Sequence, residues 1–227
     1  SIGEKNLKDR TAAKLFYTTI IKKESFKILM LLMEGQCLVF PPGISLMQSK
    51  TLTKQSIIWD TIPDILPLDI GQIKTNIVQA YAFKKRQSEE EWDYKYNYYN
   101  IENDKYITWI QDYIRDHYKA QYNKTPISVN TAGIMQKEGE GINTHNHTWE
   151  YDYEKTPDIS CLYCVAMGEK TTYITFEYKG GRIRHGRWKI PMAPRKLIIF
   201  NSEIPHYLTN NENKDPTINL SFQYQLI

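Results

Sequence analysis

The second half of the chain is a series of short stretches rich in β-branched and aromatic residues, separated by turn residues. Such stretches are typical of strands. They are residues 127–136, 142–147, 158–166, 171–179, 181–184, 187–190, 197–201, 205–208 and 217–226. No helical periodicity follows residue 125, so this half of the chain predicts a β-sandwich or jelly roll.

Two predicted turns indicate how some of these strands are connected. Residues 167–170 (MGEK) predict a hairpin that joins residues 158–166 to residues 171–179. His185 and Gly186 predict a second turn.

One amphipathic helix precedes the strands. Asp104 is a favourable N-cap for a helix at residues 105–122, and apolar side chains recur along these residues at i, i+3 and i+4 spacing. The stripe consists of Ile107, Ile110, Tyr113 or Ile114, and Tyr118. We expect this helix to pack against a sheet and to support it.

The pattern before residue 104 is irregular. Residues 14–21 and 77–83 read as strands, and residues 25–35 fit either a helix or a strand. Residues 44–74, which are punctuated by prolines, are expected to have no regular structure.

This pattern predicts a mainly β (α+β) chain in two parts. Residues 104–227 form the β domain, and residues 1–103 form an N-terminal elaboration packed on it. A single domain of 227 residues is the alternative, and this length fits either organisation.

Composition and charge narrow the class of protein. A net charge of +3 with a pI near 8.5 is too mild for a typical nucleic-acid binder. The mean hydropathy is −0.56, and the longest apolar run, residues 28–33, is far too short to span a membrane. We therefore expect no membrane partner. The polar N-terminal sequence and three sparse cysteines favour a cytoplasmic, reducing location.

Two polar stretches have open interpretations. Residues 84–104, acidic and rich in tyrosine, form either a mobile flap that contacts substrate or an exposed loop. Residues 180–189 (GGRIRHGRWK) either bind an anion, such as a cosubstrate or a nucleic-acid backbone, or form an exposed hairpin.

The chemistry of the chain is concentrated in its histidines. His145 and His147 lie two residues apart after a Gly-rich turn, a spacing that puts both side chains on one face of a strand. His206, which follows the apolar stretch 197–201, is the natural third ligand of a metal site. Neutral imidazole suits iron, zinc, copper or nickel rather than magnesium or calcium.

These motifs resemble those of the Fe(II)/2-oxoglutarate oxygenases, in particular the phage-encoded members related to prolyl hydroxylases. The resemblance covers residues 104–226 and rests on His145-Asn146-His147, on ISCLYC at residues 159–164, and on PRKLIIFNSEIPHYLTNN at residues 194–211. It implies a double-stranded β-helix with a helix before the barrel. It also implies an Fe(II) centre, 2-oxoglutarate as cosubstrate, and hydroxylation of a C–H bond.

The resemblance implies that His145, His147 and His206 are the first, second and third iron ligands. Relatives carry a carboxylate where this chain has His147. Asp152 and Asp158 lie near enough in the sequence to serve as the second ligand instead.

A second departure concerns the basic residue, usually arginine, that binds the 2-oxoglutarate carboxylate in these enzymes. Its position falls at Thr217, with Asn219 and Ser221 on the same strand face. The candidate replacements are Lys179, Arg182, Arg184, Arg187, Lys196 and Lys214. Lys179 ranks first, because it ends a strand that follows the metal-bearing one.

The motif ISCLYC contains three further residues of interest. We expect Cys161 and Cys164 to pack in the core rather than bind zinc, because residues i and i+3 of a strand face opposite sides. Tyr163, on the face opposite Cys164, is predicted to line the barrel and hydrogen-bond the cosubstrate, although a buried structural tyrosine would explain it as well.

Three functions remain open from the sequence. The first is an Fe(II)/2-oxoglutarate oxygenase whose substrate is a protein side chain, a nucleobase or a small metabolite. The second is a cupin-like metalloenzyme with three histidine ligands that acts without 2-oxoglutarate; the absence of the arginine and the presence of Asn210 after His206 favour it. The third is a jelly roll with a structural or binding role.

Overall fold

The computed structural model describes residues 48–52, 55–64, 68–87, 98–101, 104–148, 156–179 and 185–227. Several sequence predictions lie outside these residues: the elements at 14–21 and 25–35, the strand at 181–184, most of the stretch 84–104, and the candidate residues Asp152, Arg182 and Arg184. The chain divides into two units, Ser1–Ser45 and Leu46–Ile227, and every described residue belongs to the second unit.

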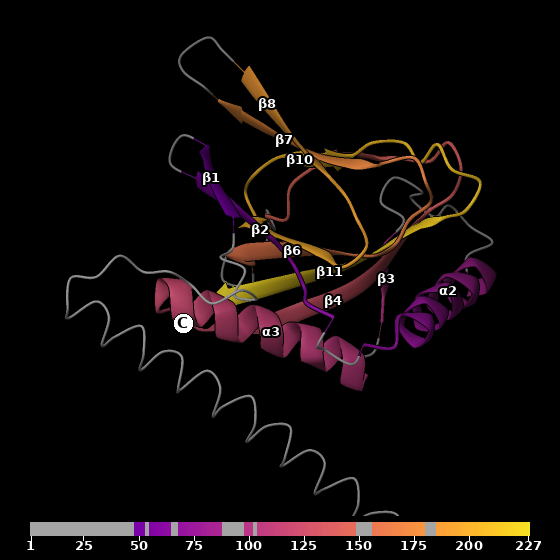
Figure 1. Ribbon diagram of the computed structural model, residues 1–227, viewed down its shortest axis with the longest axis horizontal. Coiled ribbons are helices and arrows are strands. Elements are labelled where there is room, and N and C mark those ends of the chain that lie inside the picture. The colour runs from indigo at the N-terminus through magenta and orange to yellow at the C-terminus, as the bar shows by residue number, and fades with distance from the viewer. Residues whose placement is uncertain are drawn as a thin grey trace, which may run out of the picture. The chain divides into compact units, whose positions relative to one another are not determined.

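Two antiparallel sheets form the second unit (Figure 1). The large sheet contains, in spatial order, β1 (Gln48–Leu52), β2 (Gln55–Thr61), β9 (Lys196–Asn201), β6 (Ile159–Ala166), β11 (Thr217–Leu226), β4 (Pro126–Gln136) and β3 (Tyr98–Asn100). The small sheet contains β5 (Ile142–His145), β10 (His206–Leu208), β7 (Tyr173–Lys179) and β8 (His185–Pro191).

From β4 onward the chain passes repeatedly from one sheet to the other. Strands β4, β6, β9 and β11 lie in the large sheet, and the strands between them in sequence lie in the small sheet. This alternation produces the predicted mainly β jelly roll, a double-stranded β-helix.

The hairpin predicted at residues 167–170 is therefore wrong. Strand β6 lies in the large sheet and β7 in the small sheet, so this turn connects the two layers instead of pairing its flanking strands. Asn213 holds the turn: its Oδ1 accepts from the Lys170 N–H at 2.7 Å, and its Nδ2 donates to the Lys170 carbonyl at 2.8 Å.

The turn predicted at His185 and Gly186 is also wrong. Both residues belong to β8, where they pair with Lys179 and Tyr178 of β7. A Cβ atom on Gly186 would collide with the Tyr178 ring, so this glycine makes room for a side chain rather than for a turn.

Two corrections concern the N-terminal part. Residues 44–74, expected to be irregular, contain β1 and β2, and residues 57–61 of β2 pair with β9. Residues 77–83, predicted as a strand, lie inside helix α2 (Ile70–Gln87). Ile73 and Ile77, four residues apart, are fully buried, so the apolar period is helical once residues before 77 are included.

The predicted helix at residues 105–122 is confirmed. Helix α3 spans Lys105–Tyr122, and the Asp104 side chain accepts from the Tyr106 and Ile107 amides, each at 2.8 Å. Ile107, Ile110, Tyr113 and Ile114 are buried, as the stripe predicted. No helix of the described residues is long and apolar enough to cross a membrane.

The large sheet separates two apolar cores. On its outer face, residues of the sheet pack against α2 and α3, which Figure 1 shows on that side. On its inner face, Leu162, Cys164, Ile198 and Phe200 pack against the small sheet. A pocket lies between the sheets, so the side chains on the inner face determine its chemistry.

Candidate metal centre

Two of the predicted ligands face each other on the small sheet. His145 is the last residue of β5 and His206 is the first of β10, and the two are direct partners in the antiparallel pair. His206 is 4% exposed and His145 is half-buried.

His147 reaches the site from outside the strand. The predicted strand 142–147 is two residues too long, because β5 ends at His145. The His147 N–H donates to the Ser202 carbonyl at 2.9 Å, in the loop after β9. At this point the chain leaves the small sheet and runs toward the large one. The position of His147 is therefore set by its contact with the large sheet and not by the alternation of side chains along β5.

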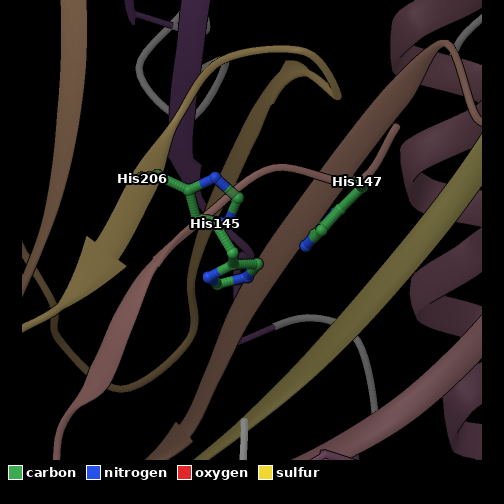
Figure 2. Close-up of side chains that lie close together, drawn as sticks. All are labelled: His145, His147 and His206. Atoms are coloured by element: carbon green, nitrogen blue, oxygen red, sulfur yellow. The ribbon is translucent and has the colours of Figure 1, made fainter. Parts of the chain in front are cut away.

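The three imidazoles converge. Their ligand nitrogens lie within 4.8 Å of one another. The ring centroids are 4.4 Å apart for His145 and His206, 4.9 Å for His147 and His206, and 5.1 Å for His145 and His147. Figure 2 shows the three rings turned toward a common point.

The hydrogen bonds of two of the rings identify which nitrogen carries the proton. The Nδ1 of His145 lies 2.8 Å from the Asn143 carbonyl, and the Nδ1 of His206 lies 2.9 Å from the Ile204 carbonyl. A carbonyl can only accept, so each Nδ1 carries the proton and each Nε2 carries the lone pair. This is the usual outer-shell arrangement of metal-binding histidines.

His147 is held by a pair of buried hydroxyls. Its Nδ1 lies 2.6 Å from the Ser160 Oγ, which lies 2.7 Å from the Ser202 Oγ. Sequence reasoning did not identify either serine as a site residue. The available signal is Ser160 itself, a polar residue within the apolar strand ISCLYC.

The electrostatics keep all three rings neutral near pH 7. Burial lowers the pKa of His206 well below its ordinary value, and it lowers that of His147 to about 3. The neighbouring imidazoles lower both values further. Burial also lowers the pKa of His145, against the opposing effect of its bond to the Asn143 carbonyl. Neutral imidazole is the form that binds a metal, so the donor set fits an iron ion.

A pocket of about 350 Å³ opens at the three histidines. Its wall is largely apolar, with Leu162 and Phe200 from the large sheet and Ile174 and Leu208 from the small one. Ser221 and Gln223 of β11 supply polar groups to the wall.

The predicted residues Thr217 and Asn219 lie on the same strand face as Ser221. Ile218 and Leu220, which alternate with them, point into the core beneath the helices. Thr217 and Asn219 are fully buried, and the Thr217 hydroxyl and both amide atoms of Asn219 have no hydrogen-bond partner among the described residues.

Two other predicted residues lie away from the pocket. Tyr163 packs in the core beneath the helices, where burial raises its pKa to about 12, so it does not line the barrel interior. Lys179 is an exposed residue at the end of β7, and alternation places it on the face opposite Ile174 and Phe176 of the inter-sheet core.

The structure also decides two alternatives. Asp158 does not join the histidine cluster; its Oδ2 accepts from the Leu226 N–H at 2.8 Å. Cys161 packs beneath the helices and Cys164 between the sheets, so the two thiols face opposite sides of β6, as predicted, and both are free.

Comparisons with known proteins give a fold but no sequence family. No family model matches the sequence, and no curated protein matches it either. The carbocyclase SnoK from nogalamycin biosynthesis, described as non-heme and α-ketoglutarate-dependent, superposes with a TM-score of 0.54 and 6% identity, over 75% of this chain and 79% of that chain.

Two further solved structures have a similar fold. A 2OG-Fe(II) oxygenase-family oxidoreductase from Burkholderia pseudomallei gives a TM-score of 0.51 with 8% identity, over 74% of this chain and 84% of that one. A prolyl-4-hydroxylase from Pseudomonas putida gives 0.50 with 10% identity, over 74% and 91%. The finer resemblance to phage-encoded oxygenases stays a prediction. The chain has the double-stranded β-helix fold of the Fe(II)/2-oxoglutarate oxygenases, with three histidines gathered between its sheets.

Proposed function

We propose that this protein is an iron-dependent oxygenase that uses 2-oxoglutarate as cosubstrate, with His145, His147 and His206 as the iron ligands. The observation that carries the proposal is the convergence of three neutral imidazoles, each with its Nδ1 already bonded, in the lining of an inter-sheet pocket. Bound Fe(II) would supply the redox chemistry that activates oxygen.

The chain's own residues would bind and orient the organic reactants. The apolar wall formed by Leu162, Ile174 and Phe200 excludes water from the space next to the histidines. Ser221 and Gln223 offer hydrogen bonds to a ligand in the pocket. The unpartnered amide of Asn219 further along the same strand face supports a polar ligand or water reaching that depth, because an unsatisfied buried amide is costly.

The proposed setting is the cytoplasm. The free thiols Cys161 and Cys164 support a reducing compartment, in which iron stays ferrous. The substrate class stays open among a protein side chain, a nucleobase and a small metabolite.

The test is metal binding followed by cosubstrate turnover. Purified full-length protein, loaded anaerobically, should bind close to one Fe(II), and the oxygenated sample should convert 2-oxoglutarate to succinate and CO₂. His206→Ala should abolish both, whereas His117→Ala, a histidine on α3 outside the cluster, should leave both intact. Metal binding that survives the loss of His145 and of His206 would falsify the site.

One observation favours a second candidate, a three-histidine metalloenzyme that does not use 2-oxoglutarate. No lysine or arginine lines the pocket within the described part of the chain. A protein that binds iron at the histidines but shows neither binding nor turnover of 2-oxoglutarate would belong to this class.

A further inference from the structure

The described lining of the pocket contains no aspartate, glutamate, lysine or arginine. Within the described ranges its lining is apolar or neutral and polar, and the polar members besides the histidines are Asn146, Thr148, Ser221 and Gln223. The inner face of β11 continues this character deeper between the sheets with Asn219 and Thr217.

The described cations proposed from the sequence are engaged elsewhere or face solvent. The Lys196 ammonium donates to the Pro191 carbonyl at 2.7 Å, and Arg187 pairs with Glu177 at 3.0 Å. Lys179 and Lys214 are exposed. None of them lines the pocket.

A dicarboxylate that binds in this pocket therefore finds no cationic side chain among the described lining residues. A carboxylate taken out of water needs a positive charge or several hydrogen bonds to compensate for lost hydration. Neutral groups such as Ser221, Gln223 and Asn219 offer hydrogen bonds but no charge. Among the residues that the structure describes, only the metal centre can supply a positive charge inside the pocket.

The second ligand decides how much charge that centre has. A two-histidine, one-carboxylate site, common among non-heme iron oxygenases, cancels one of the two positive charges of Fe(II). In this chain His147 takes the place of the carboxylate, and imidazole binds a metal ion as a neutral ligand, so the ion's charge is not reduced. The site gains one unit of positive charge relative to the carboxylate arrangement.

We infer that the two departures of this chain compensate each other: the neutral ligand His147 supplies, through the undiminished charge of the metal, the positive charge that a basic residue on β11 would otherwise supply. The ligand class is a dianionic 2-oxo acid, recognised by charge at the metal and by neutral hydrogen-bonding groups along β11. The inference rests on the proposed function and explains how 2-oxoglutarate is retained without a partner cation.

The experiment measures binding rather than turnover. The full-length protein is loaded anaerobically with Co(II), and 2-oxoglutarate is titrated by calorimetry, with metal content checked in each sample. His147→Asp should keep the metal and weaken 2-oxoglutarate binding at least tenfold. Asparagine has the shape of aspartate without its charge, so His147→Asn should weaken 2-oxoglutarate binding much less than His147→Asp does.

Two further comparisons separate charge from geometry. 2-Oxopentanoate lacks the second carboxylate, so His147→Asp should weaken it less than it weakens 2-oxoglutarate. Adding Ser221→Lys to His147→Asp places a cation on the pocket wall and should restore 2-oxoglutarate affinity, which would support the inference independently.

The outcomes are distinguishable. Failure of wild-type, metal-loaded protein to bind 2-oxoglutarate removes the proposed function itself. Wild-type binding with equal or tighter binding by His147→Asp overturns only the charge inference, as does an equal loss in His147→Asn at full metal occupancy. A tenfold loss in the double variant Arg182→Gln/Arg184→Gln would assign the cation to that segment and overturn the inference as well.

Discussion

The ring of His147 is held by a different kind of hydrogen-bond partner from those of the other two proposed ligands. His145 and His206 each bond to a backbone carbonyl two residues earlier in their own segment. His147 bonds to a side chain, the Ser160 hydroxyl, which in turn contacts Ser202. A single substitution can therefore remove the partner of His147, but not that of the other two.

We expect Ser160→Ala to weaken metal binding by about 10- to 100-fold, the usual effect of losing an outer-shell partner. The reason is that the His147 ring loses the contact that fixes its orientation and tautomer. Isothermal titration with Co(II) measures the change. Ser202→Ala is the matched control and should weaken binding less, since the Ser202 hydroxyl contacts Ser160 rather than the His147 ring. Equal affinity in Ser160→Ala and wild type would show that the hydroxyl does not position the ring.

The depressed pKa values of the three histidines predict a loss of stability in acid. In the unfolded chain a histidine titrates near pH 6.5. Burial lowers the pKa of His147 to about 3 and that of His206 well below 6.5. Between these pH values the unfolded state binds more protons than the folded, metal-free state, so stability falls as the pH falls.

Urea unfolding of the metal-free protein between about pH 7.5 and about pH 5 measures this slope, which is at most about 1.4 kcal/mol per pH unit for each histidine. His206→Gln should flatten the dependence, because it removes one of the buried groups. Stability that rises as the pH falls over this range would contradict the prediction.

Helix α3 depends on its first residues for both its start and its position. Asp104 caps two backbone amides of α3 through one oxygen, and its second oxygen accepts from Asn76 of α2 at 2.7 Å. One side chain thus joins the two helices that cover the large sheet.

Asp104→Ala should reduce the free energy of unfolding by about 1–2 kcal/mol, because it leaves the capped amides and the Asn76 amide without this partner. The matched control is Asp69→Ala at the start of α2, where the exposed carboxylate accepts from only the Gln72 amide at 2.9 Å and should cost less. Denaturant titration gives both values, and a larger loss at Asp69 would count against this account.

Helices and strands could be predicted from the sequence where a local pattern of residues determines them. Helix α3 and strand β11 lie where period and capping placed them, because a cap and a long stripe are local signals. Helix α2 was not predicted because only residues 77–83 were interpreted, as a strand, and seven residues make too few helical turns to show a helical period. The turn after β6 was misread because a turn sequence does not say which sheet its second strand joins.

The three ligands were predictable, but the face of the sheet on which each neighbouring residue lies was not. Alternation correctly put Tyr163 and Cys164 on opposite faces of β6. Which face is the barrel interior depends on where α2 and α3 pack, and those contacts join residues far apart in sequence. Tyr163 was therefore predicted on the wrong side, and the unpartnered amide of Asn219 could not be foreseen.

At the scale of the molecule, the whole site lies in one unit. All strands of both sheets, the three histidines and the pocket belong to Leu46–Ile227. We expect a fragment of residues 46–227 to fold and to bind Co(II) as the full chain does, because it retains both described cores. Circular dichroism and metal titration of the fragment test this, with the full-length protein as reference. A fragment that folds but has lost the metal would contradict it.

The position of the three ligands has a mechanical consequence. His145 and His206 belong to the small sheet, while His147 is anchored through Ser202 and Ser160 to the large one. A bound ion would therefore cross-link the two sheets through its ligands. Metal binding should slow amide hydrogen exchange in β5 and β10 far more than in β4 and β11, because β5 and β10 are only 4 and 3 residues long and carry two of the ligands.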